Sequence, residues 1–211
     1  MRLLVAAIIL LLASHLLPSA PGVRERLLAH LGRGGFYVGY SLLSLLALAS
    51  VMWAYRAAGP SPSLYEPLSA GRVIALMGMF LAVFLLVGRL TTRAPETGPI
   101  GIYRVTAVPG SLAVFIWAIV HLTNRSEARL VVIFGGLALL ALAALIKNLR
   151  LAPPAYRRVG WLPFAAVLGG QERLVLTEIG WWRLGLAVLA YLALLLLHPV
   201  VVGADPLAGL L

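Results

Sequence analysis

The sequence predicts an all-α fold, a polytopic membrane helical bundle with about six transmembrane helices. Three observations lead to this prediction: 62% of the 211 residues are hydrophobic, 11% are charged, and the mean hydropathy is +0.99. A soluble domain carries roughly 25% charged residues, which cover its surface in water. The composition therefore excludes an ordinary soluble globular protein and favours a chain that lies largely in lipid.

Six stretches are long and apolar enough to cross a membrane. A helix needs about 20 mostly apolar residues to span about 30 Å of hydrocarbon, because each residue advances it by about 1.5 Å. Backbone polar groups in hydrocarbon must also be paired within the span, which favours helices over irregular chain. The predicted spans are residues 3–20, 36–55, 73–90, 105–123, 130–146 and 181–202.

Four of the predicted spans are bounded by residues that end helices or favour the membrane interface. Proline and glycine interrupt the helical backbone, and aromatic rings concentrate where hydrocarbon meets water. Such flanking residues are Pro18 and Pro21, Phe36 and Tyr37, Gly59 and Pro60, Asn124 and Arg125, Trp181 and Trp182, and Pro199 and Gly203. Because Pro21 directly follows a possible signal-peptide cleavage site, we expect the first span to be retained as a helix.

Lysine and arginine are distributed unequally over the two predicted sides of the membrane. One side has five of these residues and the other has twelve. Cytoplasmic loops of membrane proteins carry the excess, so the side with twelve is expected to be cytoplasmic and both termini periplasmic. The net charge of +10 then faces anionic lipid, and nucleic acid is not expected as a partner.

Two connections on the basic side are expected to contain short helices at the membrane surface. Residues 147–180 form the longest connection, and structureless loops of that length are uncommon. This connection combines the basic pair Arg157-Arg158 with an apolar run over residues 161–168, as interfacial helices do. Residues 23–31 have their apolar side chains on one helical face, opposite Arg24 and Arg26.

Histidines within the spans are the main candidates for a functional site, because ionisable residues are costly in hydrocarbon. His15, His121 and His198 lie in the first, fourth and sixth predicted spans. His30 lies beside charged residues on the amphipathic stretch and is expected to be an ordinary interfacial side chain.

The residue types restrict the chemistry of such a site. The chain has no cysteine, and its predicted spans contain no Asp or Glu, which argues against thiolate and carboxylate metal sites. Imidazole is a common metal ligand, and haem needs only axial ligands and an apolar pocket in a helical bundle. The alternative is that the histidines are structural, each ring bonded to a backbone carbonyl or a serine.

Five short sequences occur in a recognisable order along nearly the whole chain. They are His15-Leu16-Leu17-Pro18-Ser19 with Val23-Arg24-Glu25-Arg26-Leu27, Phe36-Tyr37 with Tyr40-Ser41-Leu42, residues 105–121 with Pro109 and Trp117, Pro163-Phe164-Ala165-Ala166, and Leu197-His198-Pro199. Together they resemble the NnrU family of integral membrane proteins, which includes the 15-cis-zeta-carotene isomerases of plants and cyanobacteria. The resemblance implies one NnrU-like transmembrane domain over residues 1–211 in a bacterial cytoplasmic (inner) membrane.

The resemblance also implies a cofactor. In the isomerase branch it implies b-type haem, with axial ligands at the positions of His15 and His121, and in bacteria a link to denitrification. The chain departs from the family at Ala107-Val108, where the family has Arg-His between threonine and proline. It also has Ala118 where the isomerase branch has cysteine, so an exchange between cysteine and histidine ligands is impossible in this chain.

The depths of the histidines leave the second ligand open. In the predicted topology His15 and His121 differ in depth by about 10–15 Å at about 1.5 Å per residue, whereas His121 and His198 lie at similar depth. We therefore expect His121 to be a ligand and keep both His15 and His198 as its possible partners. Three arginines on the basic side, Arg89, Arg93 and Arg104, are the candidates for pairing with haem propionates.

Three functions are compatible with these features. The first is a haem b membrane protein in redox or nitrogen-oxide physiology, with an apolar or nitrogen-oxide small molecule as ligand. The second is an isomerase of long cis-polyenes. The third is a non-catalytic subunit or assembly factor that packs against a membrane protein partner. The sequence contains no nucleotide-binding loop or hydrolase triad, which argues against ATP-driven and hydrolytic functions.

Overall fold

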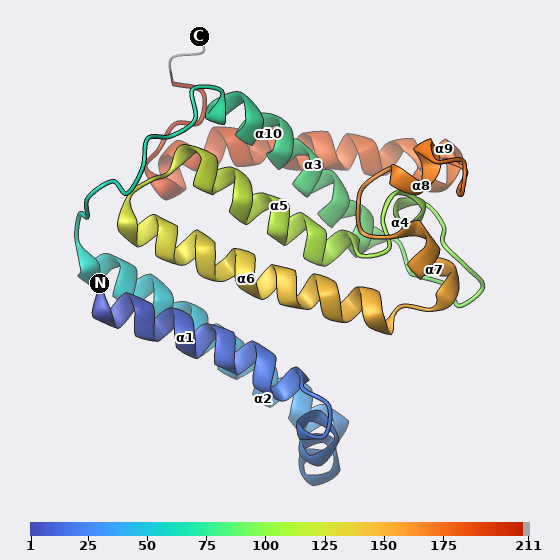
Figure 1. The fold of residues 1–211 in the computed structure, drawn as a ribbon, viewed down its shortest axis with the longest axis horizontal. Coiled ribbons are helices and arrows are strands. Elements are labelled where there is room, and N and C mark those ends of the chain that lie inside the picture. The colour runs from blue at the N-terminus through green and yellow to red at the C-terminus, as the bar shows by residue number, and fades with distance from the viewer. Residues whose placement is uncertain (209–211) are drawn as a thin grey trace. The chain divides into compact units, whose positions relative to one another are not determined.

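A computed structural model describes residues 1–208, and helices are the regular elements of this part of the chain (Figure 1). The all-α prediction is thereby confirmed. In order, the elements are α1 (Arg2–Leu16), the 3₁₀ helix η1 (Leu17–Ser19), α2 (Val23–Ala58), α3 (Gly71–Thr91), α4 (Ile102–Val105), α5 (Pro109–Asn124), α6 (Ala128–Leu151), α7 (Pro154–Val159), α8 (Ala165–Leu168), α9 (Leu176–Ile179) and α10 (Trp181–Val202).

Five helical segments among the described residues are long and apolar enough to cross a membrane. They are α1 with η1, α2, α3, α6 and α10. The prediction of a multi-pass membrane protein is therefore confirmed. The connection after α6 contains α7, α8 and α9, as expected for a segment that is partly helical.

The fourth predicted span begins later than expected. Residues 105–108 do not join α5, because Thr106 has an extended backbone, with φ −156° and ψ 144°. Its Oγ1 donates a hydrogen bond to the carbonyl oxygen of Trp161 at 2.9 Å, and the Ala107 amide donates to Gly160 at 2.8 Å. Pro109 then starts α5, since proline lacks the N–H that a first turn leaves unpaired. The predicted start at residue 105 is wrong.

The amphipathic stretch and the second span join in α2. The two parts meet at Gly32, whose φ of 66° and ψ of 171° are not helical. Glycine adopts a positive φ without the steric cost that a Cβ brings. The break separates residues 23–31 from the apolar part of α2, as the sequence predicts.

The chain forms two compact units. Unit 1 comprises Met1–Pro67 and Arg125–Leu140, and unit 2 comprises Leu68–Asn124 and the chain from Ala141 onward. The two halves of α6 therefore belong to different units. The single membrane domain predicted from the sequence stays a prediction.

Unit 1 is built on the contact of α1 with α2. Leu4 and Leu11 of α1 are 0% and 3% exposed, and they belong to the same core as Ala47, Val51 and Ala54 of α2. Small side chains on α2 let the two helices approach closely, which is how helices associate in lipid. The first half of α6 joins this core through residues that include Val132, Ile133, Leu137 and Leu140.

Unit 2 is organised around α3, with α5 and α10 alongside it (Figure 1). Two glycines of α3 allow α5 to come very close. A Cβ added to Gly78 would lie 2.5 Å from Cγ1 of Val120, and one added to Gly71 would lie 2.5 Å from the carbonyl oxygen of Thr123. The opposite face of α3 receives α10, where the Tyr191 hydroxyl donates to the carbonyl oxygen of Leu76 at 2.9 Å.

Gly71→Ala is expected to destabilise the protein by about 1–3 kcal/mol, the cost of overpacking a close contact. The added methyl group meets backbone of α5, which is unable to rotate away as a side chain does. Thermal unfolding of the purified protein in detergent measures the effect.

Gly39→Ala in α2 is the matched control, because a Cβ there has no atom within 4 Å among the described residues. We expect unchanged or slightly higher stability, since alanine favours a helix over glycine by about 1 kcal/mol. Equal stability of the two variants would show that the α3–α5 contact is loose.

Candidate functional site

His121 lies near the end of α5, one turn after Trp117, and its side chain is half-buried. Its Nδ1 is 2.7 Å from the carbonyl oxygen of Trp117, and the two ring centroids are 5.3 Å apart. Because a carbonyl oxygen only accepts hydrogen bonds, the proton of the neutral ring is on Nδ1 and Nε2 keeps its lone pair. This is the tautomer in which histidine binds a metal through Nε2, with Nδ1 held by a backbone carbonyl.

His15 has the same arrangement in unit 1. Its Nδ1 is 2.9 Å from the carbonyl oxygen of Leu11, and the Ser14 hydroxyl donates to that same oxygen at 2.9 Å. The Tyr40 ring of α2 meets the imidazole edge to face, with centroids 5.7 Å apart. The ring of His15 is thus oriented by its own helix and by α2.

His198 and His30 complete the set. The Nδ1 atom of His198 is 2.6 Å from the carbonyl oxygen of Ala204, beyond the end of α10. The Nδ1 atom of His30 is 2.8 Å from the carbonyl oxygen of Arg26. His30 is exposed, as the sequence predicts, whereas His198 is half-buried. Since exposed His30 makes the same kind of bond, the bond orients an imidazole without marking it as a ligand.

The helices that carry His121 and His198 lie on different sides of α3 near its middle. Gly78 of α3 faces α5, whereas Leu76 and Phe80 contact α10. At about 100° per residue, both of the latter lie about 160° around the helix from Gly78. α3 therefore lies between the two helices that carry these histidines. His15 belongs to unit 1, and the pairing of His121 with His15 or with His198 stays a prediction.

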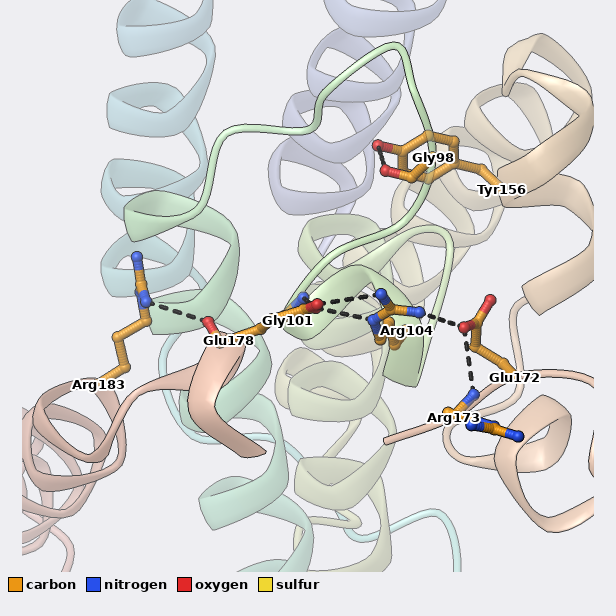
Figure 2. A network of polar contacts seen from close by, with 8 residues as sticks. All are labelled: Gly98, Gly101, Arg104, Tyr156, Glu172, Arg173, Glu178 and Arg183. Atoms are coloured by element: carbon orange, nitrogen blue, oxygen red, sulfur yellow. Dashed lines mark hydrogen bonds and ion pairs between the residues drawn. The ribbon is translucent and has the colours of Figure 1, made fainter. Parts of the chain in front are cut away.

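Arg104 is bound by two carboxylates of the same chain (Figure 2). Its Nε donates to Oε2 of Glu178 at 2.7 Å, its Nη2 donates to Oε1 at 3.0 Å, and its Nη1 contacts Glu172. The Gly101 amide also donates to Glu178, at 2.9 Å. The hydrogen bond from Arg104 holds the pKa of Glu178 below its usual range, and Glu178 raises the pKa of Arg104. The charge of Arg104 is therefore compensated within the protein.

Arg89 and Arg93 are exposed at the end of α3 and just beyond it. The stem of Arg89 runs past the start of α5, since a Cβ on Gly110 would lie 3.2 Å from its Cγ. From Gly110 to His121, α5 advances by about 16 Å at about 1.5 Å per residue. The arginines proposed for haem propionates thus lie at the opposite end of α5 from His121.

We call this region of unit 2 the basic end. It comprises the C-terminal ends of α3 and α6, the chain from Thr92 to Val108, and the connection through α7, α8 and α9 to the start of α10. Within it, Ala107 and Val108 are 8% and 5% exposed and belong to the apolar core that also contains Leu145. The place where the family carries Arg-His is therefore packed with apolar side chains in this chain.

The sequence did not single out Glu172, Glu178 or Arg183. Arg183 donates to Oγ1 and to the carbonyl oxygen of Thr91, at 3.0 and 2.9 Å, and to the carbonyl oxygen of Ile179 at 3.0 Å. It therefore joins the end of α3 to the start of α10. The chain has only seven Asp and Glu against seventeen Lys and Arg. This rarity was the one signal in the sequence that could have marked Glu172 and Glu178 as partners of arginine.

Comparison with protein families gives one finding. The family model described as NnrU protein matches residues 3–206, nearly the whole chain, and it covers all three histidines of the predicted spans. No curated protein and no solved structure matches the chain.

Arg104→Gln is expected to lower the free energy of unfolding by about 2 kcal/mol, the size of a lost hydrogen bond between charged groups. Glu178 would then keep the Gly101 amide as a partner and lose the guanidinium. Unfolding of the variant and the wild type, measured between pH 7 and pH 3, tests this.

The pH dependence has a definite sign. Because Arg104 lowers the pKa of Glu178 from its ordinary value of 4.5, the wild type keeps this stability above pH 4.5 and loses it as the pH falls further. Arg104→Gln is expected to lose less in this range. Arg173→Gln, a change at a neighbouring exposed arginine, is expected to behave like the wild type.

Proposed function

The chain belongs to the NnrU family, and from this premise we propose that it is an integral membrane protein that binds haem b through His121. We propose further that it acts in redox or nitrogen-oxide physiology. Following the excess of arginine and lysine at the basic end, we place that end in the cytoplasm and both termini in the periplasm of a bacterial inner membrane.

The observation that supports this proposal most is the setting of His121. Val120 faces α3 at Gly78, so His121, displaced by about 100° around α5, points to another side of the helix. Its ring is half-buried, and Trp117 holds the proton on Nδ1. With the proton on Nδ1, Nε2 is the nitrogen through which a neutral imidazole would bind iron.

The donor set fits haem better than a bare metal ion. Within the described residues, no group of three or more His, Cys, Asp and Glu side chains lies close enough to hold an ion. A porphyrin brings four nitrogen donors of its own, so the protein supplies only axial ligands. When bound, haem supplies one-electron transfer or the binding of a small nitrogen-oxide ligand.

The remaining residues have distinct tasks in this proposal. Trp117 orients the imidazole of His121, and the apolar residues of α5 exclude water. Arg72 lies beside Gly71, at the end of unit 2 that holds His121, and is exposed. It is therefore better placed to meet a propionate than Arg89, Arg93 or Arg104.

The protein, expressed with ample haem and purified in mild detergent, is expected to show a Soret band. His121→Ala is expected to abolish the band, because it removes the axial ligand. His30→Ala is the matched control, since His30 makes the same backbone hydrogen bond on an exposed surface. It is expected to keep the full spectrum.

His15→Ala and His198→Ala identify the second ligand, because loss of one axial imidazole shifts the Soret band and the reduction potential. A wild-type protein without a Soret band would contradict the proposal. In that case, altered isomer ratios in cells that accumulate a cis-polyene would favour an isomerase. A stoichiometric protein partner without cofactor would favour a membrane subunit.

A further inference from the structure

The basic end carries more positive charge than its own carboxylates compensate. Two of its three acidic residues, Glu172 and Glu178, are bound to Arg104. The full set is nine basic residues (Arg89, Arg93, Arg104, Lys147, Arg150, Arg157, Arg158, Arg173 and Arg183) and three acidic ones (Glu96, Glu172 and Glu178). The excess must be met by solvent ions or by an anionic partner.

α7 fixes two neighbouring arginines on the outside of the basic end. Tyr156 and Val159 are 4% and 3% exposed and anchor α7 in the core. The Tyr156 hydroxyl contacts the carbonyl oxygen of Pro95 at 2.5 Å. It also contacts the carbonyl oxygen of Gly98, at 2.9 Å (Figure 2).

Arg157 and Arg158 lie about 100° and 200° around the helix from Tyr156, and so both side chains point away from the core. Both are exposed, and no ion pair forms at either within residues 1–208.

The turn after α7 carries two large apolar side chains that are exposed, three to five residues after these arginines in the sequence. Trp161 and Leu162 are 46% and 52% exposed. Their backbone is nevertheless held firmly, because fully buried Thr106 donates to the carbonyl oxygen of Trp161 at 2.9 Å. Tryptophan is enriched where acyl chains meet headgroups. This short segment therefore offers basic side chains for lipid headgroups and apolar side chains for acyl chains.

We propose that α7 and the following turn bind anionic phospholipids. The guanidinium groups of Arg157 and Arg158 take the phosphate, since their planar donors match its oxygens. Trp161 and Leu162 enter the adjoining acyl region. A free phosphate would engage the arginines alone and leave both apolar side chains in water, which is why the partner is a lipid.

The test compares the full chain in nanodiscs of phosphatidylcholine with nanodiscs that also contain phosphatidylglycerol. The wild type is expected to unfold at a higher temperature with phosphatidylglycerol and to retain that lipid on purification. The double variant Arg157→Gln/Arg158→Gln is expected to bind phosphatidylglycerol about tenfold more weakly, because each arginine near an anionic surface contributes to binding. High salt is expected to reduce the stabilisation of the wild type by phosphatidylglycerol, because it screens the charges of the arginines and the lipid.

Arg56→Gln/Arg125→Gln is the matched control, with the same loss of charge at two exposed arginines outside the basic end. It is expected to keep the response to phosphatidylglycerol. Arg157→Lys/Arg158→Lys is expected to keep only part of it, because lysine retains the positive charge without the planar donors. An equal response in the two glutamine variants overturns the proposal. So does inorganic phosphate that stabilises the wild type in phosphatidylcholine as much as phosphatidylglycerol does.

Discussion

The close approach of α3 to α5 is the contact on which the arrangement of unit 2 depends. Lipid is as apolar as the side chains of these helices, so packing at short range, more than burial of apolar surface, must hold them together. Gly71 and Gly78 allow α5 to approach one face of α3 closely, and α10 packs on the opposite face. Gly88 admits Ile102 in the same way, with a Cβ at Gly88 lying 2.6 Å from its Cγ1. α4 is thereby seated against α3.

Once α4 is seated, the arginines of the basic end divide into two classes. Arg104 and Arg183 bond to groups of the protein and join segments that are far apart in the sequence. Because they use the nearby carboxylates and carbonyls, Arg157 and Arg158 remain exposed without compensation. The arginines of the basic end therefore provide both the hydrogen bonds that join distant segments and the positive charge on the surface.

The sequence predicted the parts of the fold that depend on local pattern. Long apolar runs gave α1, α3, α6 and α10 with errors of a few residues at their ends, and the break at Gly32 followed the change in pattern there. The start of α5 was missed, because Val105 and Val108 are apolar while the conformation of Thr106 is set by a carbonyl 55 residues away. The pairing of Arg104 with Glu178 likewise joins residues 74 positions apart and has no local signal.

His121 and the basic end are separate regions of unit 2, and the two proposals give them different tasks. They lie at opposite ends of α5, and the junction between the basic end and α5 is filled by buried Ala107 and Val108. A cation or imidazole at that junction would lie in an apolar core and carry a desolvation cost. In this chain Ala107 and Val108 pack in the apolar core and bring no charge to the junction. Under the two proposals, the imidazole that binds haem is positioned by the packing of α3 against α5, and the arginines of the basic end bind lipid independently of it.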